Sequence, residues 1–77
     1  MKLDQFFIDR AAALDNDKVI YSEEVTVCKY PDGWLILWTN PIACHDLGRW
    51  AKDEDVLRLC LGGFWNKGAC VRPGEKF

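Results

Sequence analysis

The feature that most constrains the fold of this chain is the tripeptide Pro31-Asp32-Gly33, which lies between two runs rich in β-branched and aromatic residues. Proline has the φ angle required at the second position of a type I turn, and aspartate suits the third position. Glycine accepts the left-handed conformation that closes a G1 bulge. Because the flanking runs favour strands, residues 25–39 are predicted to form a β-hairpin.

Two turn geometries fit this hairpin, and each gives a different pairing of the strands. The G1 bulge, which Pro31 favours, places Tyr30 opposite Trp34. One face of the hairpin would then be aliphatic, with Val25, Val27, Leu35, Leu37 and the stem of Lys29, and the other would carry the rings, with Tyr30, Trp34, Trp38, Ile36, Cys28 and Thr26. A two-residue Asp32-Gly33 loop would shift the pairing by one residue.

A helix is predicted on each side of the hairpin. Apolar residues from Leu3 to Leu14 follow the i, i+3, i+4, i+7 spacing, which indicates an amphipathic helix at about residues 3–14. A second helix is expected at about residues 53–61, because acids stand at its start and Gly62 follows its last apolar residue. Residues 56–61 also alternate between apolar and other residues, so a strand remains an alternative there.

The remaining stretches are less constrained. Residues 19–21 fit a third strand, either separated from the hairpin by a bend at residues 22–24 or continuous with it. After Asn40-Pro41 ends the hairpin, residues 42–50 are expected to form a loop with a helical turn. Residues 64–71 fit a second tight turn, and residues 72–77 an irregular tail.

The predicted fold is therefore a single α+β domain spanning residues 1–77. Its N-terminal helix packs on the Val25/Val27/Leu35/Leu37 face of a small antiparallel sheet. At 77 residues, with 49% hydrophobic and 29% charged residues, the chain is globular in composition but has a small core.

Composition also restricts the class of function. A formal charge of −2 disfavours a protein that depends on phosphate contacts, so nucleic acid is an unfavourable partner. The N-terminus lacks the apolar stretch of a signal peptide, and no apolar run approaches the length of a membrane span. We expect a cytoplasmic protein with reduced cysteines and no contact with a membrane.

The residues that could carry chemistry are too dispersed to form a recognisable site. Four cysteines and one histidine would suffice for zinc, but Cys28, Cys44, Cys60 and Cys70 include no closely spaced pair. Cys44, His45 and Asp46 adjoin in sequence, whereas a nucleophile and its base normally meet across a fold. We therefore predict no catalytic residues, no metal and no cofactor, and the chain is not expected to be an enzyme.

The surplus of aromatic residues points to a binding surface, because large rings are seldom fully buried in so small a core. We predict a non-enzymatic protein-binding module that acts by occlusion on a partner with a basic surface, and a homodimer is compatible with this prediction. Small phage or mobile-element inhibitors of host enzymes or defence complexes have this character. The predicted binding residues are Tyr30, Trp34, Trp38, Glu23, Glu24, Trp50, Asp53, Glu54 and Asp55.

Two alternative functions remain open from the sequence. One is a small module stabilised by zinc. The other is a single-stranded nucleic-acid binder that stacks bases on the aromatic face of the hairpin.

Overall fold

The computed structural model describes residues 3–22, 25–38 and 48–71, and these residues confirm the α+β class. The strands form one antiparallel sheet in the order β1-β2-β3-β4-β5, so that each strand pairs only with its neighbours in sequence. The elements in chain order are α1 (Gln5–Ala12), β1 (Val19–Tyr21), β2 (Val25–Tyr30), β3 (Gly33–Trp38), β4 (Gly48–Ala51), α2 (Glu54–Leu61), the 3-10 helix η2 (Trp65–Lys67) and β5 (Ala69–Val71).

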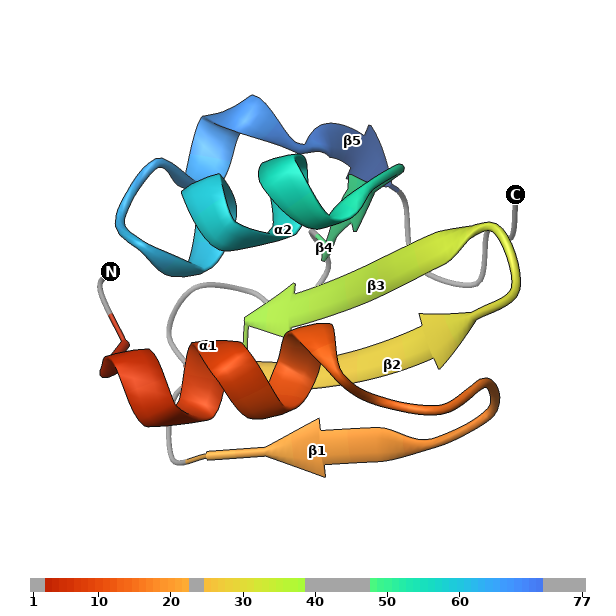
Figure 1. The fold of residues 1–77 in the computed structure, drawn as a ribbon. Coiled ribbons are helices and arrows are strands. Elements are labelled where there is room, and N and C mark those ends of the chain that lie inside the picture. Colours follow the sequence, from red (N-terminus) through yellow and green to blue (C-terminus); the bar gives the residue numbers. More distant parts are fainter. Residues whose placement is uncertain (1–2, 23–24, 39–47, 72–77) are drawn as a thin grey trace.

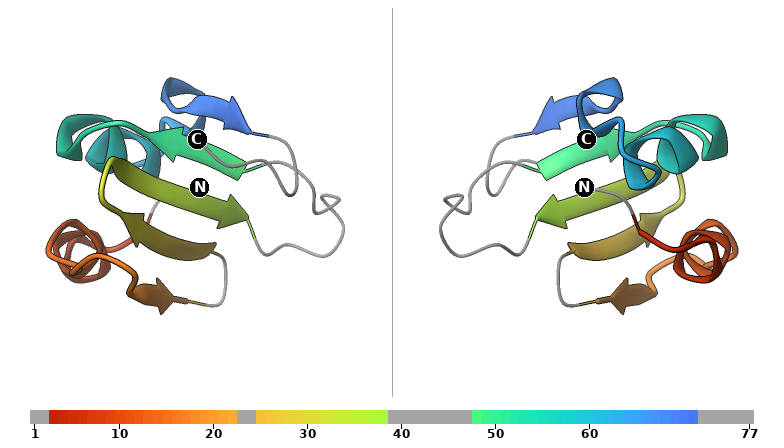
Figure 2. Two further views of the ribbon diagram at one scale, coloured as in Figure 1. Left: turned by 90° about the vertical axis from the view of Figure 1, so that its right-hand side faces the viewer. Right: turned by 90° about the vertical axis from the view of Figure 1, so that its left-hand side faces the viewer.

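Both α-helices lie on the same face of the sheet, which makes the molecule a two-layer structure (Figures 1 and 2). They run side by side, and the backbone N–H of Leu3, just before α1, donates to the carbonyl oxygen of Leu61 at the end of α2 at 3.0 Å. The guanidinium of Arg58 on α2 also contacts the carboxylate of Asp9 on α1 at 2.8 Å. These contacts join the N-terminal helix directly to α2, although more than 40 residues separate them in sequence.

Helix α1 is shorter than the predicted range of residues 3–14. It begins after Asp4, whose side chain accepts a hydrogen bond from the backbone N–H of Phe7 at 3.0 Å. Ile8 and Ala11 are its buried residues, whereas the ring of Phe6 is 71% exposed. The sequence pattern therefore identified the helix, although Phe6, one of the apolar residues that follow the helical spacing, lies on its exposed side.

The second predicted helix is confirmed as α2, against the alternative of a strand. Asp53 caps its first turn by accepting from the backbone N–H of Val56 at 2.9 Å. Leu57, Cys60 and Leu61 form its buried stripe at helical spacing. The residue with a left-handed φ after the helix is Gly63, at +117°, and not Gly62.

The hairpin is present, but its predicted pairing is wrong by one residue. Pro31 and Asp32 form the loop, and Tyr30 pairs with Gly33, so Lys29 stands opposite Trp34 and Cys28 opposite Leu35. Gly33 has a φ of +157° and does not form the expected bulge. Because side chains alternate along a strand, this shift exchanges the side chains of β3 between the two faces of the sheet, relative to those of β2.

As a consequence, the covered face of the hairpin carries Trp34 and Ile36 in place of Leu35 and Leu37. Trp34 is 8% exposed, and its indole Nε1–H donates to the carbonyl oxygen of Ala11 on α1 at 2.9 Å. The side chains that form the core under the helices are Ile8, Ala11, Val25, Val27, Trp34, Ile36, Ala51, Leu57, Cys60 and Leu61.

The third strand is confirmed as β1, and Asp17 precedes it with a φ of +66°. The predicted loop at residues 42–50 is wrong where the structure describes it, because β4 pairs along β3 from Gly48 onward. The predicted turn at residues 64–71 is replaced by η2 and β5. The predictions for residues 23–24, 39–47 and 72–77 lie outside the described residues.

Candidate protein-binding surface

The face of the sheet that points away from α1 and α2 is the most unusual surface of the molecule, and we call it the open face. The strand register assigns its side chains, because partners directly opposite one another share a face. None of the described helices lies over it (Figure 2). Its residues with described side chains are Val19, Tyr21, Thr26, Cys28, Tyr30, Leu35, Leu37, Trp50 and Ala69.

Among the described residues, none of those that the register places on the open face is charged, although Asp17 and Lys18 line a pocket with Val19 and Cys28 at its edge. Sheets with one solvated face usually alternate apolar residues on the core side with polar residues on the other, whereas here both faces are dominated by apolar side chains. Tyr21 is 70% exposed, Val19 56% and Leu37 39%. Several exposed apolar side chains on one sheet face are typical of an interaction surface.

Trp50 forms the most buried part of the open face. Its ring lies over Gly33 of the neighbouring strand, where an added Cβ would come within 2.6 Å of the ring. The ring centroid of Tyr30 lies 6.1 Å from that of Trp50, with the two planes inclined by 41°. Trp50 is only 9% exposed, so it supports the surface more than it offers contact area.

A second glycine shapes the aliphatic part of the open face. A Cβ added at Gly48 would lie 3.0 Å from the side chain of Leu37 and 3.4 Å from that of Leu35. The two leucine side chains therefore rest against the glycine backbone of the adjacent strand. Side chains held in this way lose little further freedom when a partner binds.

Catalytic chemistry finds no support among the described side chains. Cys28 lies on the open face as a free thiol, and burial raises its pKa, which disfavours the thiolate. Burial likewise raises the pKa of Cys60, whose Sγ lies 3.6 Å from the carbonyl oxygen of Trp65. Within residues 3–22, 25–38 and 48–71, no group of three or more His, Cys, Asp or Glu side chains could hold a metal ion.

The aromatic residues predicted to bind a partner do not share one surface. Tyr30 and Trp50 come together on the open face, but Trp34 belongs to the core under the helices. The prediction that Trp34 offers its ring to a partner is therefore wrong, because the shifted register turns it inward. Trp38 ends β3, and its side chain is not described.

Two of the predicted acidic residues already have structural roles in α2. Asp53 is the N-cap, and Glu54 accepts a hydrogen bond from Nε of Arg58 at 2.8 Å. Asp55 lies on the outer side of the helix, on the layer opposite the open face. Glu23 and Glu24 are outside the described residues, so the approach of a basic partner stays a prediction.

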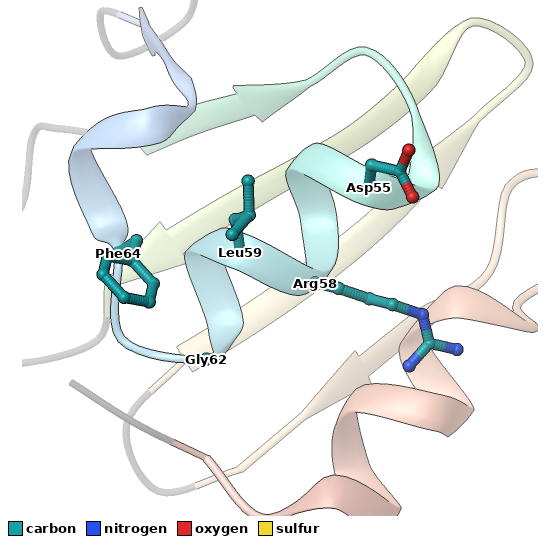
Figure 3. Close-up of a pocket in the computed structure, with 5 residues that line it drawn as sticks. All are labelled: Asp55, Arg58, Leu59, Gly62 and Phe64. Atoms are coloured by element: carbon teal, nitrogen blue, oxygen red, sulfur yellow. The ribbon is translucent and has the colours of Figure 1, made fainter.

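An open groove of about 400 Å³ on the outer side of α2 is a second candidate (Figure 3). It is lined by Asp55, Arg58, Leu59, Gly62 and Phe64. Arg58 is its only basic side chain, and its guanidinium is engaged by Asp9 and Glu54, both at 2.8 Å. The charge of Arg58 is therefore already balanced by two carboxylates, which disfavours an anionic ligand in this groove.

The apolar lining of this groove is explained by the end of α2. The backbone N–H of Phe64 donates to the carbonyl of Leu59 at 2.9 Å, and that of Gly63 donates to the carbonyl of Cys60 at 3.3 Å. These two bonds are those of a Schellman motif, which commonly brings together the two side chains at Leu59 and Phe64. The groove is thus a by-product of helix termination.

Of the nine residues on the open face, the sequence analysis predicted only Tyr30 and Trp50 as binding residues, and it missed the exposed apolar residues Val19, Tyr21 and Leu37. Alternation within residues 19–21 and within the hairpin was visible, but it does not say which set faces the helices. Only the register of β2 against β3 settles that question. The signal that could have fixed the register, the strand β4 beside β3, was itself not recognised.

In comparisons with known proteins, no family model, no curated protein and no solved structure matches the chain. Neither of the α-helices described is long and apolar enough to cross a membrane.

Proposed function

We propose that this chain is a non-enzymatic protein-binding module that acts by occlusion, and that its open face is the contact surface. The observation that carries the proposal is the lack of any charged residue among the described side chains of that face. Exposed side chains there include Tyr21, Val19 and Leu37, which would otherwise leave apolar area in water.

The preorganisation of the face supports the same conclusion. Leu35 and Leu37 rest on Gly48, and Trp50 rests on Gly33 and lies close to Tyr30. A rigid apolar surface binds with a smaller loss of side-chain entropy than a flexible one. Inhibition of an enzyme or defence complex by steric cover is the mode of action that such a surface fits, because it requires contact area and no reacting group.

The two alternative functions receive less support. A platform for single-stranded nucleic acid combines stacking rings with basic side chains that follow the backbone, and the open face has rings without such charges. For zinc, the two cysteines with described side chains are separated by the sheet, because Cys28 of β2 lies on the open face and Cys60 of α2 lies in the core on the other side. Neither alternative is favoured by a specific contact.

The test uses two large exposed residues with matched accessibility. Tyr21 on the open face is 70% exposed, and Phe6 on α1 is 71% exposed. Tyr21→Lys and Phe6→Lys should both fold, because neither ring is buried. The full-length parent and both variants would be immobilised, and proteins retained from a lysate of the source cell would be quantified.

We expect partners that are retained by the parent and by Phe6→Lys but lost by Tyr21→Lys, and a purified partner should bind Tyr21→Lys at least tenfold more weakly. That factor corresponds to about 1.4 kcal/mol, which is more than most contact residues contribute and is expected of one of the few that dominate an interface. If instead Phe6→Lys abolished retention and Tyr21→Lys did not, the binding surface would lie on the helical layer and the proposal would be wrong.

A further inference from the structure

We infer that the open face pairs with the open face of a second copy of this chain, in a two-fold symmetric dimer. This inference rests on one part of the proposed function, that the open face is a contact surface, and it assigns an occupant to that surface. In such a dimer the two sheets pack face to face and the helices lie outermost. The arrangement is a sheet-on-sheet sandwich, in which apolar side chains of both inner faces interdigitate.

Charge complementarity selects a second copy over a charged partner. A partner that presented lysine, arginine or carboxylate side chains would lose their hydration against an uncharged face without gaining an ion pair. Two copies of the open face bring no charged side chain from the residues described, so like charges do not oppose one another across the two-fold axis. The charged residues Asp9, Arg10, Glu54, Asp55 and Arg58 belong to the helical layer, which stays in water.

The chemical composition of the face also matches the interfaces of homodimers, which are more apolar than those of transient complexes. Leucine, valine and tyrosine side chains dominate, with Thr26 and the tyrosine hydroxyls as polar groups. In an isologous interface the same patch must complement itself. A face of mixed aliphatic and aromatic side chains meets this requirement without needing paired charges.

The available area sets the expected strength. Five strands spaced about 4.8 Å apart, with the longest about 20 Å in length, present a face of roughly 400 Å² in projection. Even with the added area of corrugated side chains, such a contact falls at the lower end of specific interfaces. The dimer should therefore be weak, with a dissociation constant in the micromolar range, and it should dissociate on dilution.

The experiment is sedimentation equilibrium of the full chain from about 1 µM to 1 mM, starting from a monomer mass of 8.9 kDa. Leu37 on the open face and Leu59 on α2 provide a matched pair, at 39% and 44% exposed. We expect the parent and Leu59→Lys to approach twice the monomer mass, and Leu37→Lys to raise the dissociation constant at least tenfold. Tyr21→Lys is the second variant on the open face, and circular dichroism verifies that each variant is folded.

Salt separates this interface from one built on ion pairs. The dissociation constant of the dimer should change by less than about twofold between 50 and 500 mM salt, because contacts between uncharged side chains are little affected by ionic screening. A parent that remains a monomer at 1 mM overturns the inference. The inference is also overturned if the dimer forms with unchanged affinity in both Leu37→Lys and Tyr21→Lys. It is overturned as well if Leu59→Lys weakens the dimer as much as Leu37→Lys does.

Failure of the dimer can be told apart from failure of the proposed function. If the parent is monomeric but Tyr21→Lys still abolishes capture of another protein, the proposed function stands and only the second copy is excluded. If the dimer forms through the open face but no captured protein depends on Tyr21, the inference stands and occlusion of another protein is excluded.

Discussion

Ile36 and Leu37 are adjacent in sequence, but the strand register places their side chains on opposite faces of the sheet. Ile36 is fully buried under the helices, whereas Leu37 points to the open face and is 39% exposed. We expect Ile36→Ala to lower the free energy of unfolding by about 2–5 kcal/mol, because it leaves a cavity in the core. Leu37→Ala should cost less than half as much, which corrects the expectation from sequence that Leu37 is a core residue.

Chemical denaturation of the two alanine variants checks this prediction. Equal losses of stability, or a larger loss for Leu37→Ala, would mean that the two side chains had been assigned to the wrong faces. Phe6→Ala serves as the control, since a ring that is 71% exposed should contribute little.

Gly33 is the residue on which the register depends most. Its φ of +157° is rarely adopted by other residues, and a Cβ would collide with the Ala51 carbonyl oxygen and the ring of Trp50. We expect Gly33→Ala to destabilise the fold by about 2 kcal/mol or more, from backbone strain and overpacking together. Asp32→Ala, at the exposed neighbouring turn position, is the matched control in thermal and chemical unfolding. Unchanged stability in Gly33→Ala would show that Trp50 does not lie over this glycine.

At the scale of the elements, Arg58 joins the two helices through Asp9. Its hydrogen bond is the main reason that the pKa of Asp9 lies below the ordinary value of 3.8, and a hydrogen bond from Gln5 lowers it further. Because the pKa is lower in the folded chain than in the unfolded one, the contact stabilises the fold above about pH 4. This contribution is lost as the pH falls through the lowered pKa.

Arg58→Met should therefore raise the pKa of Asp9 toward its ordinary value and make stability less dependent on pH between about 5 and 2. The effect should be small, since the two side chains are 37% and 56% exposed. Titration of the Asp9 carboxyl carbon by NMR gives the pKa directly. Arg10→Met is the control, because it removes a positive charge from the same layer without removing a hydrogen bond to Asp9, and it should leave the pKa of Asp9 unchanged. An equal rise of the Asp9 pKa in both variants would mean that net charge, and not the hydrogen bond from Arg58, lowers it.

The elements that could be predicted from sequence are those specified locally. Helix α2 has its capping aspartate, its buried stripe and its terminal glycines in one stretch, and the hairpin has its turn residues between β-prone runs. The pairing within the hairpin was not predictable, because Gly33 is held by Trp50 and Ala51 of β4. Strand β4 itself is short and begins with glycine, so no periodic pattern reveals it.

At the scale of the whole molecule, the helical layer carries both charged residues and the exposed apolar side chains of Phe6, Leu59 and Phe64, whereas the side chains described on the open face are uncharged. The charged residues of α1 and α2 lie on one layer, and an uncharged sheet face lies on the other. The sequence indicated a surplus of apolar side chains and a binding role, and that role stays a prediction. It could not indicate the binding surface, because a shift of one residue in the register exchanges the covered and exposed sets of β3.

The hydrogen bond from Leu3 to Leu61 has a consequence for the order in which the chain is made. A ribosome releases α1 first and α2 much later, after all of the sheet except β5. Until α2 emerges, Ile8, Ala11 and the inner side of the sheet lack the side chains of Leu57, Cys60 and Leu61 that complete the core. Stable structure therefore forms only after α2 has been synthesised, and until then the apolar residues on both faces of the sheet stay exposed in the nascent chain.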